Sequence, residues 1–87
     1  MAEQWHLDPK TAFGRIIKAV RMEQGVSQEA LADLCRMSRP QLSSVETGQT
    51  DLKLTSIFRL AQGLDVHATD LMRRTEEIMT SGGRRQG

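Results

Sequence analysis

The sequence predicts an all-α fold, a compact bundle of five short helices, and three observations support this prediction. Apolar residues recur in several segments at the 3.6-residue period of an amphipathic helix. Residues that favour helix N-caps stand before these segments, and glycines follow three of them. No long segment alternates polar residues with β-branched or aromatic ones, as a half-buried strand would. With 87 residues and 3% aromatic content, the chain has room for one domain with an aliphatic core.

The first helix is expected to begin at Asp8 and Pro9 and to stop at Gly25. Aspartate is a good N-cap, and proline is favoured in the first turn of a helix. Glycine readily takes the left-handed conformation that often follows a helix. The apolar face of this segment consists of Phe13, Ile16, Ile17 and Val20.

Two short helices are expected next, the first of them capped by Ser27. The second opens with Ser38, which forms a capping box with Gln41, and it ends at Gly48. Pro40 stands in its first turn, where the missing N–H does no harm. The first of the two carries Leu31, Leu34 and Cys35 at helical spacing. The side chains expected to point inward are Leu31, Cys35, Leu42 and Val45.

The last two helices are predicted over Lys53 to Gly63 and from His67 onward. Asp70, in the first turn of the final helix, suits the positive end of the helix dipole. The apolar stripe of the segment after Lys53 consists of Leu54, Ile57, Phe58, Ala61 and Leu64. The less polar side of the final segment consists of Leu71, Met72, Thr75, Ile78 and Met79.

We expect residues 1–80 to form a single domain and residues 81–87 to be a flexible basic tail. No secretory signal and no apolar run of membrane-spanning length is visible, and Cys35, the only cysteine, cannot form an intramolecular disulfide. These features predict a cytoplasmic protein. The formal net charge is +1, but residues 10–60 contain eight basic and five acidic residues. That central segment is therefore moderately attractive to DNA.

The most informative segment is residues 27–48, where only Arg36, Met37 and the cap Ser38 separate two short helices. So short a connection turns the second helix sharply away from the first, as in a helix-turn-helix. The outer face of the second helix lacks large apolar side chains and is rich in groups that bind base edges and phosphates. That face consists of Arg39, Pro40, Gln41, Ser43, Ser44 and Thr47.

These features resemble the lambda-repressor-like helix-turn-helix family (the Xre/Cro group) over about residues 13–72. The resemblance implies an ion pair between Arg21 and Glu46, which explains why a glutamate stands near the end of a DNA-reading helix. The matching positions are Ile16, Arg21, Gly25, Ser27, Gln28, Leu31, Ala32, Leu42, Val45, Glu46, Gly48, Leu54, Ile57, Ala61 and Leu64.

The resemblance also implies which side chains contact double-stranded DNA. Gln28 is expected at the DNA backbone, and Arg39, Pro40 and Ser44 are expected to face bases in the major groove. The complete set implied or expected to contact DNA is Gln28, Arg36, Ser38, Arg39, Pro40, Gln41, Ser43, Ser44, Thr47 and Lys53.

Two residues depart from the family pattern. Arg36 occupies a turn position that usually holds glycine, and a positive φ there costs a non-glycine residue about 1–2 kcal/mol. Pro40 replaces a position where many relatives have a polar base reader, and it offers at most an apolar contact to a thymine methyl group.

The remaining candidate sites favour structural roles. Cys35 is expected to be buried, as a small hydrophobic side chain. His6 and His67 have no Cys/His cluster around them, so we expect no metal and no cofactor.

Two interpretations of the final helix remain open. In one, it forms the seam of a homodimer through Leu71, Thr75, Ile78, Met79 and Trp5. In the other, it folds back on the first helix of its own chain and shields Trp5.

The leading functional hypothesis is a sequence-specific DNA-binding transcriptional regulator, a homodimeric repressor or autoregulator on a near-palindromic operator. The alternative is a protein-interaction module of the same fold, such as an antitoxin or adaptor, with little DNA readout of its own. Pro40 and the small net charge favour that alternative. We do not expect an enzyme, because no nucleophile–base arrangement, phosphate-binding glycine loop or acid–base pair is visible.

Overall fold

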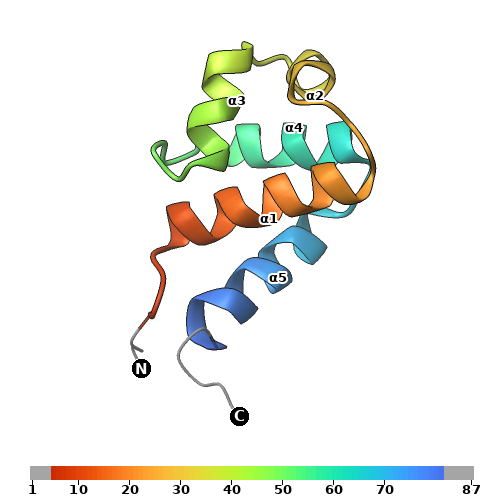
Figure 1. Ribbon diagram of the computed structural model, residues 1–87. Coiled ribbons are helices and arrows are strands. Elements are labelled where there is room, and N and C mark those ends of the chain that lie inside the picture. The colour runs from red at the N-terminus through yellow and green to blue at the C-terminus, as the bar shows by residue number, and fades with distance from the viewer. Residues whose placement is uncertain (1–4, 82–87) are drawn as a thin grey trace.

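The computed structural model describes residues 5–81, which form five helices (Figure 1). They are α1 (Pro9–Glu23), α2 (Gln28–Leu34), α3 (Arg39–Glu46), α4 (Leu54–Leu64) and α5 (Ala68–Ser81). No strand occurs in the described residues, and the predicted all-α fold is confirmed. α1 crosses the middle of the molecule, with α5 packed on one side of it and α3 and α4 on the other (Figure 1).

Three of the predicted helix starts are confirmed by side-chain hydrogen bonds. Oδ1 of Asp8 accepts from the backbone N–H of Thr11 at 3.0 Å, and Oγ of Ser27 accepts from that of Ala30 at 3.0 Å. At the start of α3, Oγ of Ser38 accepts from the N–H of Gln41 at 3.2 Å, while Oε1 of Gln41 accepts from the N–H of Ser38 at 2.8 Å. This reciprocal pair is the predicted capping box.

The first four helices all end with a residue at positive φ. Gly25 and Gly48 follow α1 and α3, whereas Arg36 and Asp65 follow α2 and α4 with φ values of 61° and 58°. The strained position of Arg36 was predicted. The stop at Asp65 was not: α4 continues through Gly63 and ends at Leu64.

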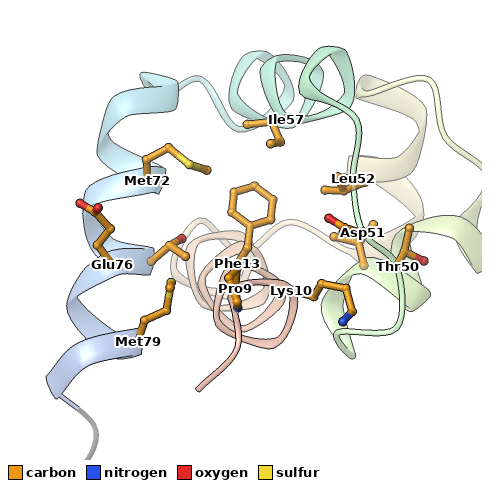
Figure 2. A pocket seen from close by; sticks show the side chains of 12 residues that line it. Pro9, Lys10, Phe13, Thr50, Asp51, Leu52, Ile57, Met72, Glu76 and Met79 are labelled. Atoms are coloured by element: carbon orange, nitrogen blue, oxygen red, sulfur yellow. The ribbon is translucent and has the colours of Figure 1, made fainter. Parts of the chain in front are cut away.

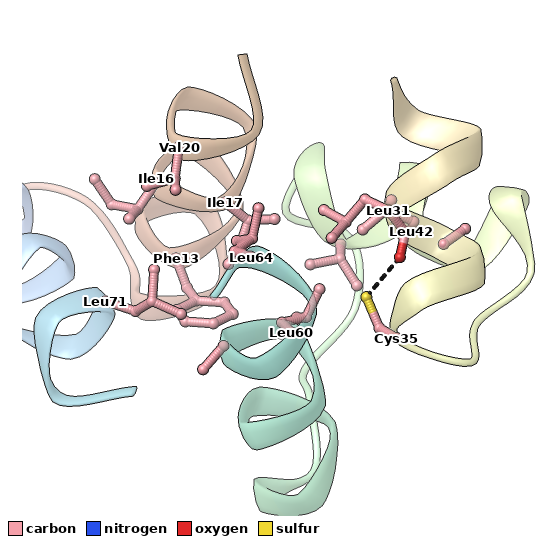
Figure 3. Packing of buried hydrophobic residues seen from close by; sticks show 13 residues of the cluster. Phe13, Ile16, Ile17, Val20, Leu31, Cys35, Leu42, Leu60, Leu64 and Leu71 are labelled. Carbon is pink, nitrogen blue, oxygen red and sulfur yellow. Dashed lines mark hydrogen bonds between the residues drawn. The ribbon is translucent and has the colours of Figure 1, made fainter. Parts of the chain in front are cut away.

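The core is aliphatic, as expected, and gathers side chains from all five helices. Figure 3 shows the buried side chains of α1 and α4 meeting those of α2 and α3 around Ile17 and Leu64. The largest fully buried side chains are Ile17, Leu31, Leu42, Leu60, Leu64, Leu71 and Cys35.

The predicted apolar stripe of α4 is partly wrong. Leu54 and Phe58 are 70% and 54% exposed, whereas Leu60, which the stripe omitted, is fully buried. The buried side of α4 is set by where α1 and α2 lie, and those contacts are not visible in the local sequence. Leu34 of α2 is also exposed, although it stands at helical spacing from Leu31.

The predicted dimer seam is also corrected. Leu71, Thr75 and Met79 are buried within their own chain because α5 packs along α1, so they are not surface groups. The Thr75 hydroxyl donates to the Leu71 carbonyl at 2.7 Å, which satisfies its buried oxygen. Ile78 is half-buried against the core. The alternative, that α5 folds back on α1, is confirmed, but Trp5 is not shielded: it is 59% exposed.

The boundary of the predicted tail shifts by one residue, because Ser81 is the last residue of α5. The rest of that tail, residues 82–87, lies outside the described residues. No described helix is both long and apolar enough to cross a membrane.

Candidate nucleic-acid interface

The turn between α2 and α3 sets the direction of α3. The N–H of Met37 donates to the Ala32 carbonyl at 2.9 Å, and the N–H of Arg36 donates to the Asp33 carbonyl at 3.3 Å. These two bonds form the C-terminal motif in which glycine is usual, and Arg36 occupies the left-handed position at φ 61°. The turn therefore carries about 1–2 kcal/mol of backbone strain.

A close backbone contact between α1 and α3 fixes the position of α3. A Cβ added to Gly14 would lie 2.2 Å from the carbonyl oxygen of Val45 and 3.0 Å from that of Glu46. The residue that follows the C-cap of α3 also lies close to α1, because a Cβ on Gly48 would lie 2.9 Å from Cα of Thr11. The sequence interpretation missed Gly14. The available signal was a glycine inside a helix, which costs about 1 kcal/mol relative to alanine and so points to a packing requirement.

A buried ion pair ties α1 to the end of α3, as the family resemblance implied. Nε and Nη2 of Arg21 donate to the two carboxylate oxygens of Glu46 at 2.6 and 3.0 Å. The side chains are only 12% and 3% exposed, and Nη1 of Arg21 also donates to the Val26 carbonyl at 2.9 Å. The hydrogen bonds to Glu46 raise the pKa of Arg21 above its ordinary value, against the opposing effect of burial.

The same ion pair holds two of the predicted DNA-contacting residues. Nε2 of Gln28 donates to Oε1 of Glu46 at 3.1 Å, and Nε of Arg39 donates to Oε1 of Gln28 at 3.4 Å. Gln28 was expected only at the DNA backbone, but its amide also links Arg39 to Glu46. No hydrogen bond among the described residues uses the two terminal nitrogens of Arg39, so they remain available to a ligand.

The outer face of α3 carries the polar side chains predicted for it. Arg39, Pro40, Gln41 and Thr47 are exposed, and Ser43 and Ser44 are half-buried. Some of these groups are already engaged. Ser38 and Gln41 bind each other in the capping box, and the Thr47 hydroxyl donates to the Ser43 carbonyl at 3.0 Å. Arg39, Ser43 and Ser44 are therefore the side chains on this face with the most free hydrogen-bonding groups.

A groove of about 520 Å³ runs beside this face, between α3 and the start of α4. It contains two predicted residues, Arg36 and Lys53, and one basic residue that was not predicted, Arg59. Arg59 was missed because it stands outside the helix-turn-helix segment. Its approach to α3 depends on how α4 packs.

The Cys35 side chain is buried, as predicted. Cys35 is 1% exposed, and its thiol donates to the Leu31 carbonyl at 2.8 Å. Burial raises the pKa of this thiol to about 11. His6 and His67 are exposed. Within residues 5–81, no group of three or more His, Cys, Asp or Glu side chains is placed to hold a metal ion.

Comparison with known proteins places this geometry in a family. Residues 17–71 match the helix-turn-helix family model. The HTH-type transcriptional regulator y4dJ of Sinorhizobium fredii is 30% identical over 71 residues, which cover 82% of this chain and 92% of that protein. The control protein C.BamHI of Bacillus amyloliquefaciens is 31% identical over 61 residues, which cover 69% and 75% of the two chains.

A solved structure agrees with these relatives. The restriction-modification controller protein C.AhdI from Aeromonas hydrophila superposes with a TM-score of 0.69 and 36% identity, covering 70% of this chain and 92% of that one. The matched region contains α2, α3 and the turn that joins them. The chain belongs to the helix-turn-helix family, in its lambda-repressor-like (Xre/Cro) group.

Proposed function

We propose that the protein is a sequence-specific DNA-binding transcriptional regulator that inserts α3 into the major groove. One observation carries the proposal: α3 presents a polar outer face while its C-terminal end is fixed against α1. The contact at Gly14 and the pair between Arg21 and Glu46 hold this end in place. A helix held in this way, with exposed hydrogen-bonding groups, suits the direct readout of base edges.

Arg39 is the leading base reader on this face. Its side chain is oriented by Gln28, and its terminal nitrogens are free to donate to O6 and N7 of a guanine. Such a bidentate contact discriminates between bases by about 1–3 kcal/mol. Ser44 lies one turn after Pro40 on the same face, so the proline contributes an apolar surface and the serine a hydroxyl.

The relatives named above support a regulatory role. Two are named as control or controller proteins and one as an HTH-type transcriptional regulator. We propose that this chain regulates by occupying an operator, as a repressor or autoregulator. No catalytic step is required for that action.

We further propose that the protein reads its operator as a homodimer, with a seam that differs from the one expected from the sequence. An apolar groove of about 200 Å³ opens between α1, α4 and α5, and Figure 2 shows Phe13, Ile57 and Met72 around it. Leu54, which is also exposed, stands one turn before Ile57 on α4. A second copy seated on this apolar surface would supply the second recognition helix that half-site reading requires.

The alternative function is a protein-interaction module that keeps the fold without reading DNA. Pro40 favours it, because a proline in the first turn of the outer face cannot donate a hydrogen bond to a base. In that case the apolar groove would bind another protein, and the outer face of α3 would have no role in binding.

Replacing two side chains of the outer face tests the proposal. The doubly substituted protein Arg39→Ala with Ser44→Ala should remain folded and lose binding to the duplex that the wild type enriches from a random pool. Arg15→Ala is the matched control, since it removes an exposed cation from α1 beside α5. Fluorescence anisotropy measures both affinities. Equal affinities for the double variant and the control would favour the interaction module.

A further inference from the structure

The groove beside α3 is lined by residues from four parts of the chain. They come from the α2–α3 turn, from α3 itself, from the α3–α4 loop and from the first turns of α4. Three exposed cations converge on it, Arg36, Lys53 and Arg59, against one carboxylate, Asp51.

None of these three cations takes part in an ion pair within residues 5–81. The ion pairs of the described chain use Lys10, Arg21, Arg73 and Arg74 instead. The cations of the groove therefore repel one another, and only Asp51 offsets them. A site with this charge balance attracts an anion.

The width of the DNA major groove indicates which anion this protein groove would bind. The major groove is about 12 Å wide, and a helix with its side chains is about 10–12 Å across. A helix seated in the major groove therefore has a sugar–phosphate strand along each flank. One flank of α3 carries Arg39, whose Nε donates to Oε1 of Gln28 at the start of α2. The other flank faces the cationic groove, because Pro40, Gln41 and Ser44 of α3 form its wall.

We infer that the groove between α3 and α4 binds the phosphodiester backbone of one DNA strand through Arg36, Lys53 and Arg59. This inference rests on the proposed function and adds to it the path of one strand. It gives Arg59 a role that no motif of the helix-turn-helix segment assigns. It also gives a reason for an arginine at the left-handed turn position, since the side chain supplies a phosphate contact at the cost of backbone strain.

The salt dependence of binding tests the inference. The slope of log K against log salt is negative, and removing one cation that binds a phosphate should reduce its magnitude by about 0.9. The affinity at about 150 mM salt should fall roughly fivefold. Arg59→Ala and Lys53→Ala are each expected to show this change on the operator and on unrelated duplexes alike, because phosphate contacts carry no sequence information. Arg15→Ala, on the α5 side of α1, should leave the slope unchanged.

Arg36→Gly separates the structural role of Arg36 from its binding role, because stability and DNA affinity should change in opposite directions. Glycine relieves the strain at φ 61°, so the thermal midpoint should rise. The affinity for DNA and the magnitude of the salt slope should fall. Asp65→Gly is the matched control, because it relieves the same strain at φ 58° outside the groove. Its midpoint should also rise, and its slope should match that of the wild type.

The outcomes separate this inference from the proposed function. Operator binding with an unchanged slope in Arg59→Ala and Arg36→Gly would overturn the inference and leave the proposed function intact. Absence of binding to any duplex by the folded wild type would overturn both. Asp51→Asn adds an independent check with the opposite sign: it removes the groove's only carboxylate and should raise the affinity for all duplexes.

Discussion

At the scale of single residues, the ion pair between Arg21 and Glu46 links stability to DNA reading. Glu46 neutralises a buried guanidinium, and it also anchors Gln28, which in turn contacts Arg39. Without the carboxylate, Arg21 would be buried with only the Val26 carbonyl as a partner. A single side chain therefore affects both the free energy of unfolding and the orientation of Arg39, the proposed base reader.

Glu46→Gln should lower the free energy of unfolding by about 3 kcal/mol or more, because breaking a buried pair leaves an uncompensated charge. Glu23→Gln is the matched control, since Glu23 pairs with Arg74 at 3.1 Å on the surface. Such exposed pairs contribute about 0–1 kcal/mol. Urea denaturation measures both variants. Similar decreases for the two would show that the Glu46 carboxylate has no special structural role.

The Cys35 thiol should react slowly in the native protein. Its pKa is raised to about 11 by burial, so the thiolate is nearly absent at neutral pH. Iodoacetamide labelling at pH 8 should be slow in buffer and fast in urea, and equal rates would contradict the burial.

The stability of the protein should also depend on pH through Cys35. In the folded state the Cys35 thiol keeps its proton above pH 9, where the thiol of the unfolded chain begins to lose its proton. The free energy of unfolding should therefore fall as pH rises from about 9 toward 11, and Cys35→Ala should lack that contribution.

At the scale of helices, local signals predicted the helix starts well but not the faces that the helices bury. The caps at Asp8, Ser27 and Ser38 depend on residues within one turn, and all three were predicted from the sequence. The buried side of α4 depends on neighbours far away in the chain. Leu54 and Phe58 satisfied the helical period as well as Leu60 did, so periodicity alone was unable to choose between the two faces.

The candidate site, like the helices, was predicted from the sequence only in part. Arg39, Ser44 and the Arg21–Glu46 pair followed from the family resemblance, because the helix-turn-helix keeps a fixed spacing. Arg59 and the network through Gln28 did not follow, since both depend on side-chain contacts between separate helices.

The two glycines inside helices should respond very differently to alanine. Gly14→Ala places a methyl group 2.2 Å from the Val45 carbonyl oxygen, so α3 must move away from α1. We expect the free energy of unfolding to fall by at least about 2 kcal/mol, together with weaker DNA binding. Gly63→Ala meets only side-chain atoms of α2 at 3.2–3.3 Å, and it gains about 1 kcal/mol of helix propensity. Its stability should change little. Equal urea midpoints for the two variants would contradict the close contact between α1 and α3.

At the scale of the whole molecule, the apolar groove between α1, α4 and α5 is the proposed dimer surface. Met72→Lys, which places a charge in this groove, should shift the protein to a monomer in sedimentation experiments and weaken operator binding. Met22→Lys is the control, because Met22 is an exposed methionine on α1 that does not line this groove. A dimer that survives Met72→Lys but dissociates in Met22→Lys would place the seam elsewhere.

The central claim is that α3 reads a specific DNA sequence in a paired assembly, and selection from random duplex DNA tests it most directly. The purified protein is incubated with the pool at about 150 mM salt, where non-specific binding is weak, and the bound fraction is sequenced. The account predicts an enriched two-fold symmetric motif whose half-sites lie about 10 base pairs apart, with a guanine that Arg39→Ala no longer requires. A folded protein that enriches no sequence would contradict the claim.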